Sequence, residues 1–109
     1  MAPARFPPIM RRMTPQRRQQ QITEAHQAVR LRFILTELDL AITFCQLSLG
    51  TEDNARAERN AENARQAYKA ATHFLEGAQP PPDMNHEIAV RMEKLRPMLA
   101  KLPQAIPQP

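Results

Sequence analysis

The chain has 109 residues, including two glycines, eleven prolines, one cysteine, four phenylalanines, one tyrosine and no tryptophan. This length suits one domain, the shortage of strand-forming residues argues against a sheet, and a single cysteine excludes an internal disulfide. The formal net charge of +4 is unevenly spread, because residues 1–32 hold seven arginines and one acidic residue, whereas residues 33–109 hold eight basic and ten acidic residues.

Residues 1–15 form a basic, proline-rich arm, which we expect to be disordered because its apolar surface is too small to offset the entropy of ordering. Thr14 and Pro15, at its end, suit the cap and first position of a helix. The arginines in and just after the arm could bind the phosphates of nucleic acid or of an anionic membrane surface. Alternatively, they could serve only to keep the chain soluble. These candidate phosphate contacts are Arg5, Arg11, Arg12, Arg17 and Arg18.

Neither proline nor glycine interrupts residues 16–49, which predicts a helix of about 34 residues and about 50 Å. An apolar seam follows it at alternating steps of three and four residues: Ala28, Leu31, Leu35, Leu38, Ile42, Cys45 and Leu49. A second apolar stripe lies on a different side: Phe33, Leu40, Phe44 and Leu47. Because such a helix needs partners on both sides, the stripe is a candidate association surface, which a third helix or a second copy in a homodimer could cover.

Gly50 is expected to end this helix in the left-handed conformation, and Thr51 to Asp53 to cap a second helix over residues 52–76. The short connection predicts that the two helices run antiparallel. Small side chains dominate the seam of the second helix and permit close packing. This seam comprises Ala57, Ala61, Ala64, Tyr68, Ala71 and Leu75. Tyr68, Phe74 and Leu75 are expected to fill the wider end of the hairpin.

Ala64, Tyr68 and Ala71 resemble, in their spacing, the small, aromatic and small positions of the second helix of a tetratricopeptide repeat. The resemblance covers roughly eight residues and implies close helix packing. The first helix departs from the family in its length and at the expected aromatic positions, and there is no second copy. We therefore carry over no peptide-binding residues.

Residues 77–82 contain three consecutive prolines and predict a stiff linker, followed by a third helix over residues 83–102. Pro97 is expected either to kink this helix or to open a short final turn. Its apolar residues Ile88, Met92, Leu95 and Leu99 should pack on the hairpin. The predicted fold is all-α, a long antiparallel helical hairpin plus a third helix, resembling a three-helix bundle with coiled-coil-type packing. Residues 16–102 form its single domain, and residues 103–109 a loose tail.

No catalytic, cofactor-binding or metal-binding residues are predicted. His26, His73 and His86 lie on three different segments and lack a recognised metal-ligand spacing, and Cys45 suits a core position with a raised pKa. The predicted function is a non-enzymatic protein–protein interaction or scaffold module that could also associate with itself. The alternative is a small nucleic-acid-associated protein that uses its arginine-rich arm. Without a predicted membrane span or secretory signal, we expect the protein to be cytoplasmic.

Overall fold

Three helices make up nearly all of residues 14–104, the part of the chain that the computed structural model describes. They are α2 (Pro15–Leu49), α3 (Asn54–Glu76) and α4 (Pro82–Lys101). Residues 14–104 contain no strand, so the all-α fold of a hairpin plus a third helix is confirmed. The predictions of a disordered arm and a loose tail fall mainly on residues 1–13 and 105–109, which lie outside the described residues.

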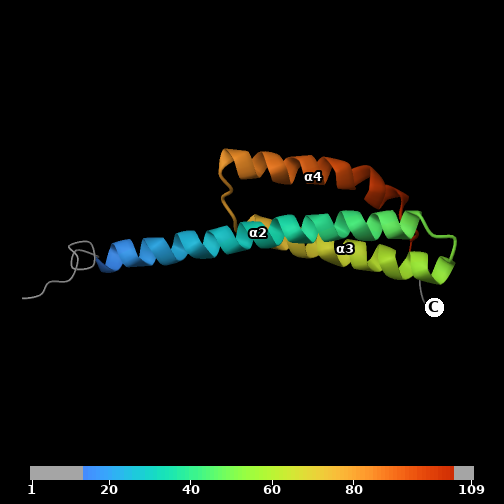
Figure 1. Cartoon of the computed structure of the whole chain (residues 1–109), viewed down its shortest axis with the longest axis horizontal. Helices are drawn as coiled ribbons and strands as arrows, with labels where there is room; N and C mark the ends of the chain where they lie inside the picture. The colour runs from blue at the N-terminus through green and yellow to red at the C-terminus, as the bar shows by residue number, and fades with distance from the viewer. Residues whose placement is uncertain (1–13, 105–109) are drawn as a thin grey trace, which may run out of the picture.

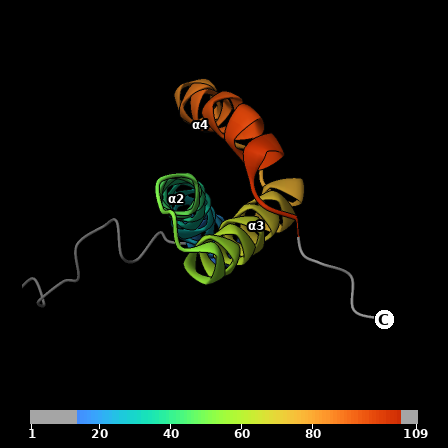
Figure 2. The same cartoon turned by 90° about the vertical axis from the view of Figure 1, so that its right-hand side faces the viewer.

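The long helix α2 is the common support of the other two helices. It packs against both α3 and α4, and the end-on view shows that α3 and α4 lie on different sides of it (Figure 2). The end of α3 meets α2 at Arg30, which bonds to the carbonyl of Gly77. We call residues 15–29, which precede Arg30, the overhang, because this end of α2 projects past α3 and α4 (Figure 1). Every residue of the overhang except Gln27 is exposed. Its last residues line a shallow pocket with Gly77, Gln79 and Pro81 of the linker, but the overhang packs against neither α3 nor α4.

Short polar contacts fix the helix starts. The Thr14 hydroxyl accepts a hydrogen bond from the Arg17 backbone N–H at 3.0 Å, and Pro15 occupies the first turn, as predicted. Asp53 caps α3 by accepting from the backbone N–H of Arg56 at 3.2 Å, while the hydroxyl of Thr51 accepts from the backbone N–H of Asp53. Because Asp53 rather than Thr51 is the cap, α3 starts at Asn54, later than predicted.

The prediction of a left-handed Gly50 is wrong. Gly50 has φ −97° and ψ −1°, and no residue from 14 to 104 has a positive φ. Its backbone N–H donates to the Gln46 carbonyl at 3.0 Å, and a Cβ added at Gly50 would lie 3.0 Å from that same oxygen. Glycine suits this position because space is short there, and not because the backbone needs an unusual conformation.

The core face of α2 is wider than the predicted seam. Ala28 and Leu49 are exposed and Leu35 is half-buried, so these three residues contribute less than expected. Because α2 packs against two helices on different sides, the buried surface extends beyond a single heptad row to rows that the prediction left out. The buried residues of α2 are Leu31, Ile34, Leu38, Ala41, Ile42, Cys45 and Ser48.

Between α2 and α3 the packing is dominated by alanine, as predicted. Ser48 on α2 lies among apolar neighbours, and its hydroxyl donates a buried hydrogen bond of 2.7 Å to the carbonyl of Ala57. At the other end of the hairpin, the Arg30 guanidinium donates to the carbonyl of Gly77 at 3.1 Å. The buried residues of α3 are Ala57, Ala61, Ala64, Ala67 and Ala71.

Helix α4 packs on α2 through Ile88 and Leu95, which are buried, while Pro97 lies inside the helix instead of ending it. Leu102, just past its end, is also buried, and a hydrogen bond from the Arg65 side chain to the Pro103 carbonyl ties this end to α3. Only one end of α4 is thus fastened to α3.

Candidate association surface

A row of exposed side chains runs along α2 on the side away from its core face. The positions alternate by four and three residues, which is a heptad spacing, and all of them are exposed. We call this row the outer seam, and it comprises Ile22, His26, Val29, Phe33, Thr36, Leu40, Thr43 and Leu47. At about 100° per residue, its middle lies about 150° around the helix from the middle of the core face.

The apolar members of the outer seam are large and well exposed. Their exposed fractions are 43% for Ile22, 66% for Val29, 38% for Phe33, 41% for Leu40 and 51% for Leu47. Scattered single apolar residues are normal on protein surfaces, whereas a contiguous apolar row is typical of an interaction surface. This row continues from the helical body onto the overhang, over about 38 Å at about 1.5 Å per residue.

Helix α4 leaves the predicted association stripe open, because it packs on a different side of α2. Phe33, Leu40 and Leu47 of that stripe all belong to the outer seam and are exposed. Phe44 differs, because it is half-buried and packs against the core cluster. The structure thus brings three of the four predicted residues into one exposed row and places Phe44 at its margin.

Helix α3 adds an aromatic residue beside the outer seam. The rings of Phe33 and Phe74 meet edge to face, with centroids 4.8 Å apart and an interplanar angle of 68°. The His73 ring also meets Phe74 edge to face, with centroids 5.6 Å apart, and Phe74 itself is 38% exposed. Phe74 is therefore less buried than predicted for the wider end of the hairpin. Phe74 directly precedes Leu75, which is half-buried, and this position in the sequence already indicated that Phe74 lies off the core face.

Charged residues flank the outer seam on both sides. Arg30 and Glu37 follow one side and Arg32 and Asp39 the other, with an arginine seven residues before an acid in each case. The Arg30 guanidinium is held near α3 by the carbonyl of Gly77. Arg32 and Glu37 have no hydrogen-bond or ion-pair partner among residues 14–104. The edges of the seam therefore carry both signs of charge.

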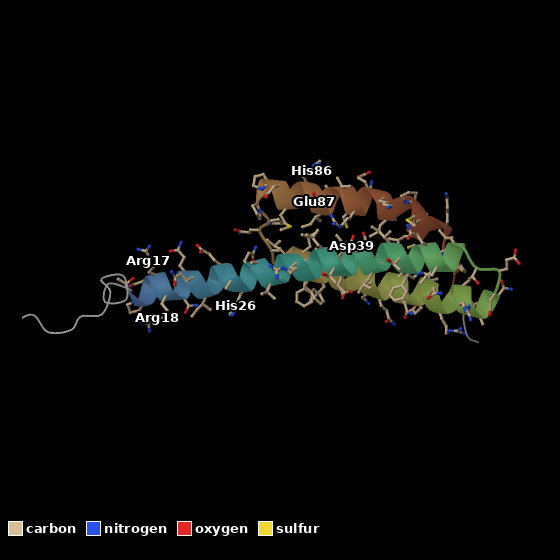
Figure 3. The ribbon with its side chains drawn as sticks, in the orientation of Figure 1. Arg17, Arg18, His26, Asp39, His86 and Glu87 are labelled. Carbon is tan, nitrogen blue, oxygen red and sulfur yellow. The ribbon has the colours of Figure 1, made fainter. Side chains whose placement is uncertain are left out.

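Asp39 also links α2 to α4. The Arg91 Nε donates to Asp39 Oδ1 at 2.8 Å, and Arg91 Nη1 donates to Glu87 Oε2 at 2.7 Å. Figure 3 shows Asp39 on the side of α2 that faces α4, near Glu87. Hydrogen bonds to Glu87 and to Asp39 raise the pKa of Arg91. Because these side chains are partly exposed, such pairs stabilise the fold by only about 0–1 kcal/mol each.

The predicted phosphate contacts are only partly placed. Arg17 and Arg18 are exposed in the first turn of α2, far from α3 and α4 (Figure 3). Arg5, Arg11 and Arg12 lie outside the described residues. Arg17 and Arg18, the two described members of the set, therefore have no neighbouring helix beside them that could complete a phosphate site.

Cys45 lies at the centre of the core face and is fully buried. Burial raises the pKa of its thiol, and the nearby positive charge of Arg65 opposes this shift only in part. The prediction that Cys45 fills the core with a raised pKa is confirmed. Among residues 14–104, no group of three or more His, Cys, Asp or Glu side chains is placed to hold a metal ion.

Comparison with known proteins gives no family assignment: no family model, no curated protein and no solved structure matches this chain. Within the described part of the chain, no helix has the length and apolar character needed to cross a membrane. The exposed surface of the helices is therefore the guide to what the chain does.

Proposed function

We propose that this chain is a non-enzymatic helical interaction module that binds another protein or a second copy of itself through the outer seam. The observation that carries the proposal is the exposed apolar row on α2, opposite the core face. A water-exposed row of Ile, Val, Phe and Leu lowers the solubility of a protein when no binding partner covers it. Covering it with a partner releases ordered water and supplies the main favourable contribution to binding.

The test compares two glutamate variants that differ only in where the charge is placed. Leu40→Glu puts a carboxylate in the middle of the outer seam, whereas Val90→Glu puts one on α4, where Val90 is 52% exposed and outside the seam. Circular dichroism should show the same helical content for both. We then expect Leu40→Glu to lose an association, with itself or with another protein, that Val90→Glu retains.

The readouts are the mass in solution by light scattering and the proteins retained from a lysate by the full-length chain. If both variants and the unchanged protein show the same mass and retain the same proteins, the outer seam has no role in association and the proposal is wrong.

A second candidate function is binding to the phosphates of nucleic acid, and it is supported by the exposed pair Arg17 and Arg18 on the overhang. Arg17→Gln with Arg18→Gln should weaken binding to duplex DNA or single-stranded RNA and reduce the slope of log affinity against log salt by about 2. An unchanged slope, or no binding at low salt by the unchanged protein, would remove this candidate.

We also propose a cytoplasmic location, supported by a core that contains a buried, unpaired cysteine and needs no disulfide. Cell fractionation of the tagged full-length chain tests this, and recovery in a secreted or organelle fraction would contradict it.

A further inference from the structure

The spacing of the outer seam is the same when read from either end, so the row can pair in the opposite direction with the same row of a second copy. We propose that the outer seam pairs with the outer seam of a second copy of this chain, with the two α2 helices antiparallel and the two-fold axis passing between Ile34 and Leu35. This inference rests on the proposed function, because it names the partner and the geometry for the same surface. A symmetric dimer of this kind requires one patch that complements itself.

Antiparallel pairing matches the sizes of the seam side chains. Ile22 lies opposite Leu47 of the partner subunit, and Val29 lies opposite the partner's Leu40, so aliphatic side chains meet. Phe33 lies opposite the partner's Thr36, where the short threonine leaves room for the ring. Parallel pairing would instead place Phe33 against the partner's Phe33 and Thr36 against the partner's Thr36. That would alternate crowded and underfilled layers along the seam.

The flanking charges favour the same arrangement. In an antiparallel pair, each flank of one helix faces the same flank of the other, so Arg30 faces the partner's Glu37 and Arg32 faces the partner's Asp39. The two-fold axis repeats both contacts. Arg30 and Asp39 remain available, since each uses only part of its hydrogen-bonding capacity within the chain.

The charges also fix the register. A slip of one heptad in one direction would bring Arg30 against the partner's Arg30 and Arg32 against the partner's Arg32. A slip in the other direction would bring Glu37 against the partner's Glu37 and Asp39 against the partner's Asp39. Both slips replace opposite-charge contacts with like-charge contacts, which destabilise a helix pair. Only the register with its axis between Ile34 and Leu35 pairs every flanking charge with its opposite.

The proposed dimer also gives the overhang a partner. Antiparallel pairing places the overhang of each chain along the second half of the partner's α2, so that Ile22 and Val29 are covered. Arg18 then reaches the level of the partner's Asp53, at the acidic turn between α2 and α3 where Glu52 and Asp53 are exposed. A parallel dimer would instead place both copies of Arg17 and Arg18 side by side, where they repel.

The size of the seam indicates how stable such a dimer is. A strip about 38 Å long and about 10 Å wide covers about 380 Å² per chain. This is below the roughly 800 Å² per partner of a standard interface, so we expect a reversible dimer with a dissociation constant in the micromolar range.

The experiment measures the distance between two copies of one labelled position. In the full-length chain carrying Cys45→Ala and Gln46→Cys, a nitroxide label at the exposed position 46 has one counterpart in the partner. At about 1.5 Å per residue and with helix axes about 10 Å apart, the proposed register predicts a separation of about 36 Å by double electron–electron resonance. The slipped registers predict about 26 or 46 Å, and a parallel pair predicts about 10 Å.

If Cys45→Ala proves too unstable to use, a charge variant tests the register without removing the cysteine. Arg32→Glu would replace both symmetric Arg32–Asp39 contacts of the dimer with contacts between two carboxylates. We expect this change to weaken the dimer by about tenfold or more in sedimentation. The matched control is Arg59→Glu, since Arg59 is an exposed arginine of α3 and belongs to neither the outer seam nor its flanks, and we expect it to leave dimerisation unchanged. Equal effects of the two variants would overturn the register.

The outcomes separate this inference from the proposed function. A dimer with a label separation other than about 36 Å overturns the antiparallel register but leaves the outer seam as an association surface. A protein that stays monomeric from about 1 to about 200 µM overturns the second-copy partner. If the protein stays monomeric but Leu40→Glu no longer binds another protein that the unchanged chain binds, the proposed function is still supported. If Leu40→Glu changes neither self-association nor the binding of another protein, both the dimer and the proposed function are wrong.

Discussion

Leu38 and Leu40 are two residues apart on α2 but lie on opposite faces, which makes them a direct test of the fold. Leu38 is fully buried in the core cluster, whereas Leu40 is 41% exposed on the outer seam. Leu38→Ala should therefore leave a cavity and lower the free energy of unfolding by about 2–5 kcal/mol. Leu40→Ala removes about three methylene groups at about 0.8 kcal/mol each, and exposure reduces the loss to at most about 1.4 kcal/mol.

The assay is urea unfolding followed by circular dichroism at a protein concentration of about 1 µM, below the expected dimer dissociation constant. Both variants change helix propensity by the same amount, so the difference between them reports burial alone. At about 100 µM, the loss for Leu40→Ala should grow, because the dimer stabilises only the unchanged chain. Equal losses at low concentration, or a larger loss for Leu40→Ala, would refute the assignment of the two faces.

Three further changes test other parts of the fold. Ser48→Ala removes the buried hydrogen bond to the Ala57 carbonyl and should cost about 0.5–1.5 kcal/mol in urea unfolding, whereas an unchanged midpoint would mean that this bond adds no stability. Asp53→Ala removes the α3 cap and should cost about 1 kcal/mol, with Asp53→Asn largely retaining the stability. Burial raises the pKa of the Cys45 thiol above its ordinary value, so the folded state favours the protonated thiol, and stability should fall as pH rises above about 8.5, the pKa of an exposed cysteine. Cys45→Ala should lose that part of the pH dependence, and a native Cys45 that reacts with a thiol reagent as fast as the unfolded chain would contradict its burial.

The arrangement of helices could be predicted because local signals agree with each other. Uninterrupted helix formers, the break at Gly50 and the three prolines of the linker place the ends of all three helices close to where the structure has them. The alanine row of α3 predicts close packing, and its alanines are buried. These features depend on neighbouring residues along the chain and need no knowledge of the tertiary structure.

Other features depend on where distant parts of the chain meet. The burial of Ile34, Ala41 and Ser48 follows from α2 packing on two sides, which a single heptad row does not show. The Gly50 error had another cause, because a glycine at the end of a helix can be selected for space as well as for a positive φ. Among the candidate site residues, Phe44 sits only one row from the seam, and its partial burial depends on the exact position of α3.

The way α4 is attached predicts which part of the protein opens first. Its N-terminal end begins after Pro81 with no side-chain cap, while its other end is held by buried Leu102 and by the bond from Arg65 to Pro103. Opening that begins at Pro82 breaks contacts with α2 only, whereas opening the hairpin disrupts the alanine-lined packing as well. Backbone amides near the start of α4 should therefore exchange with solvent fastest among the packed helices, by a local opening that leaves α2 and α3 together.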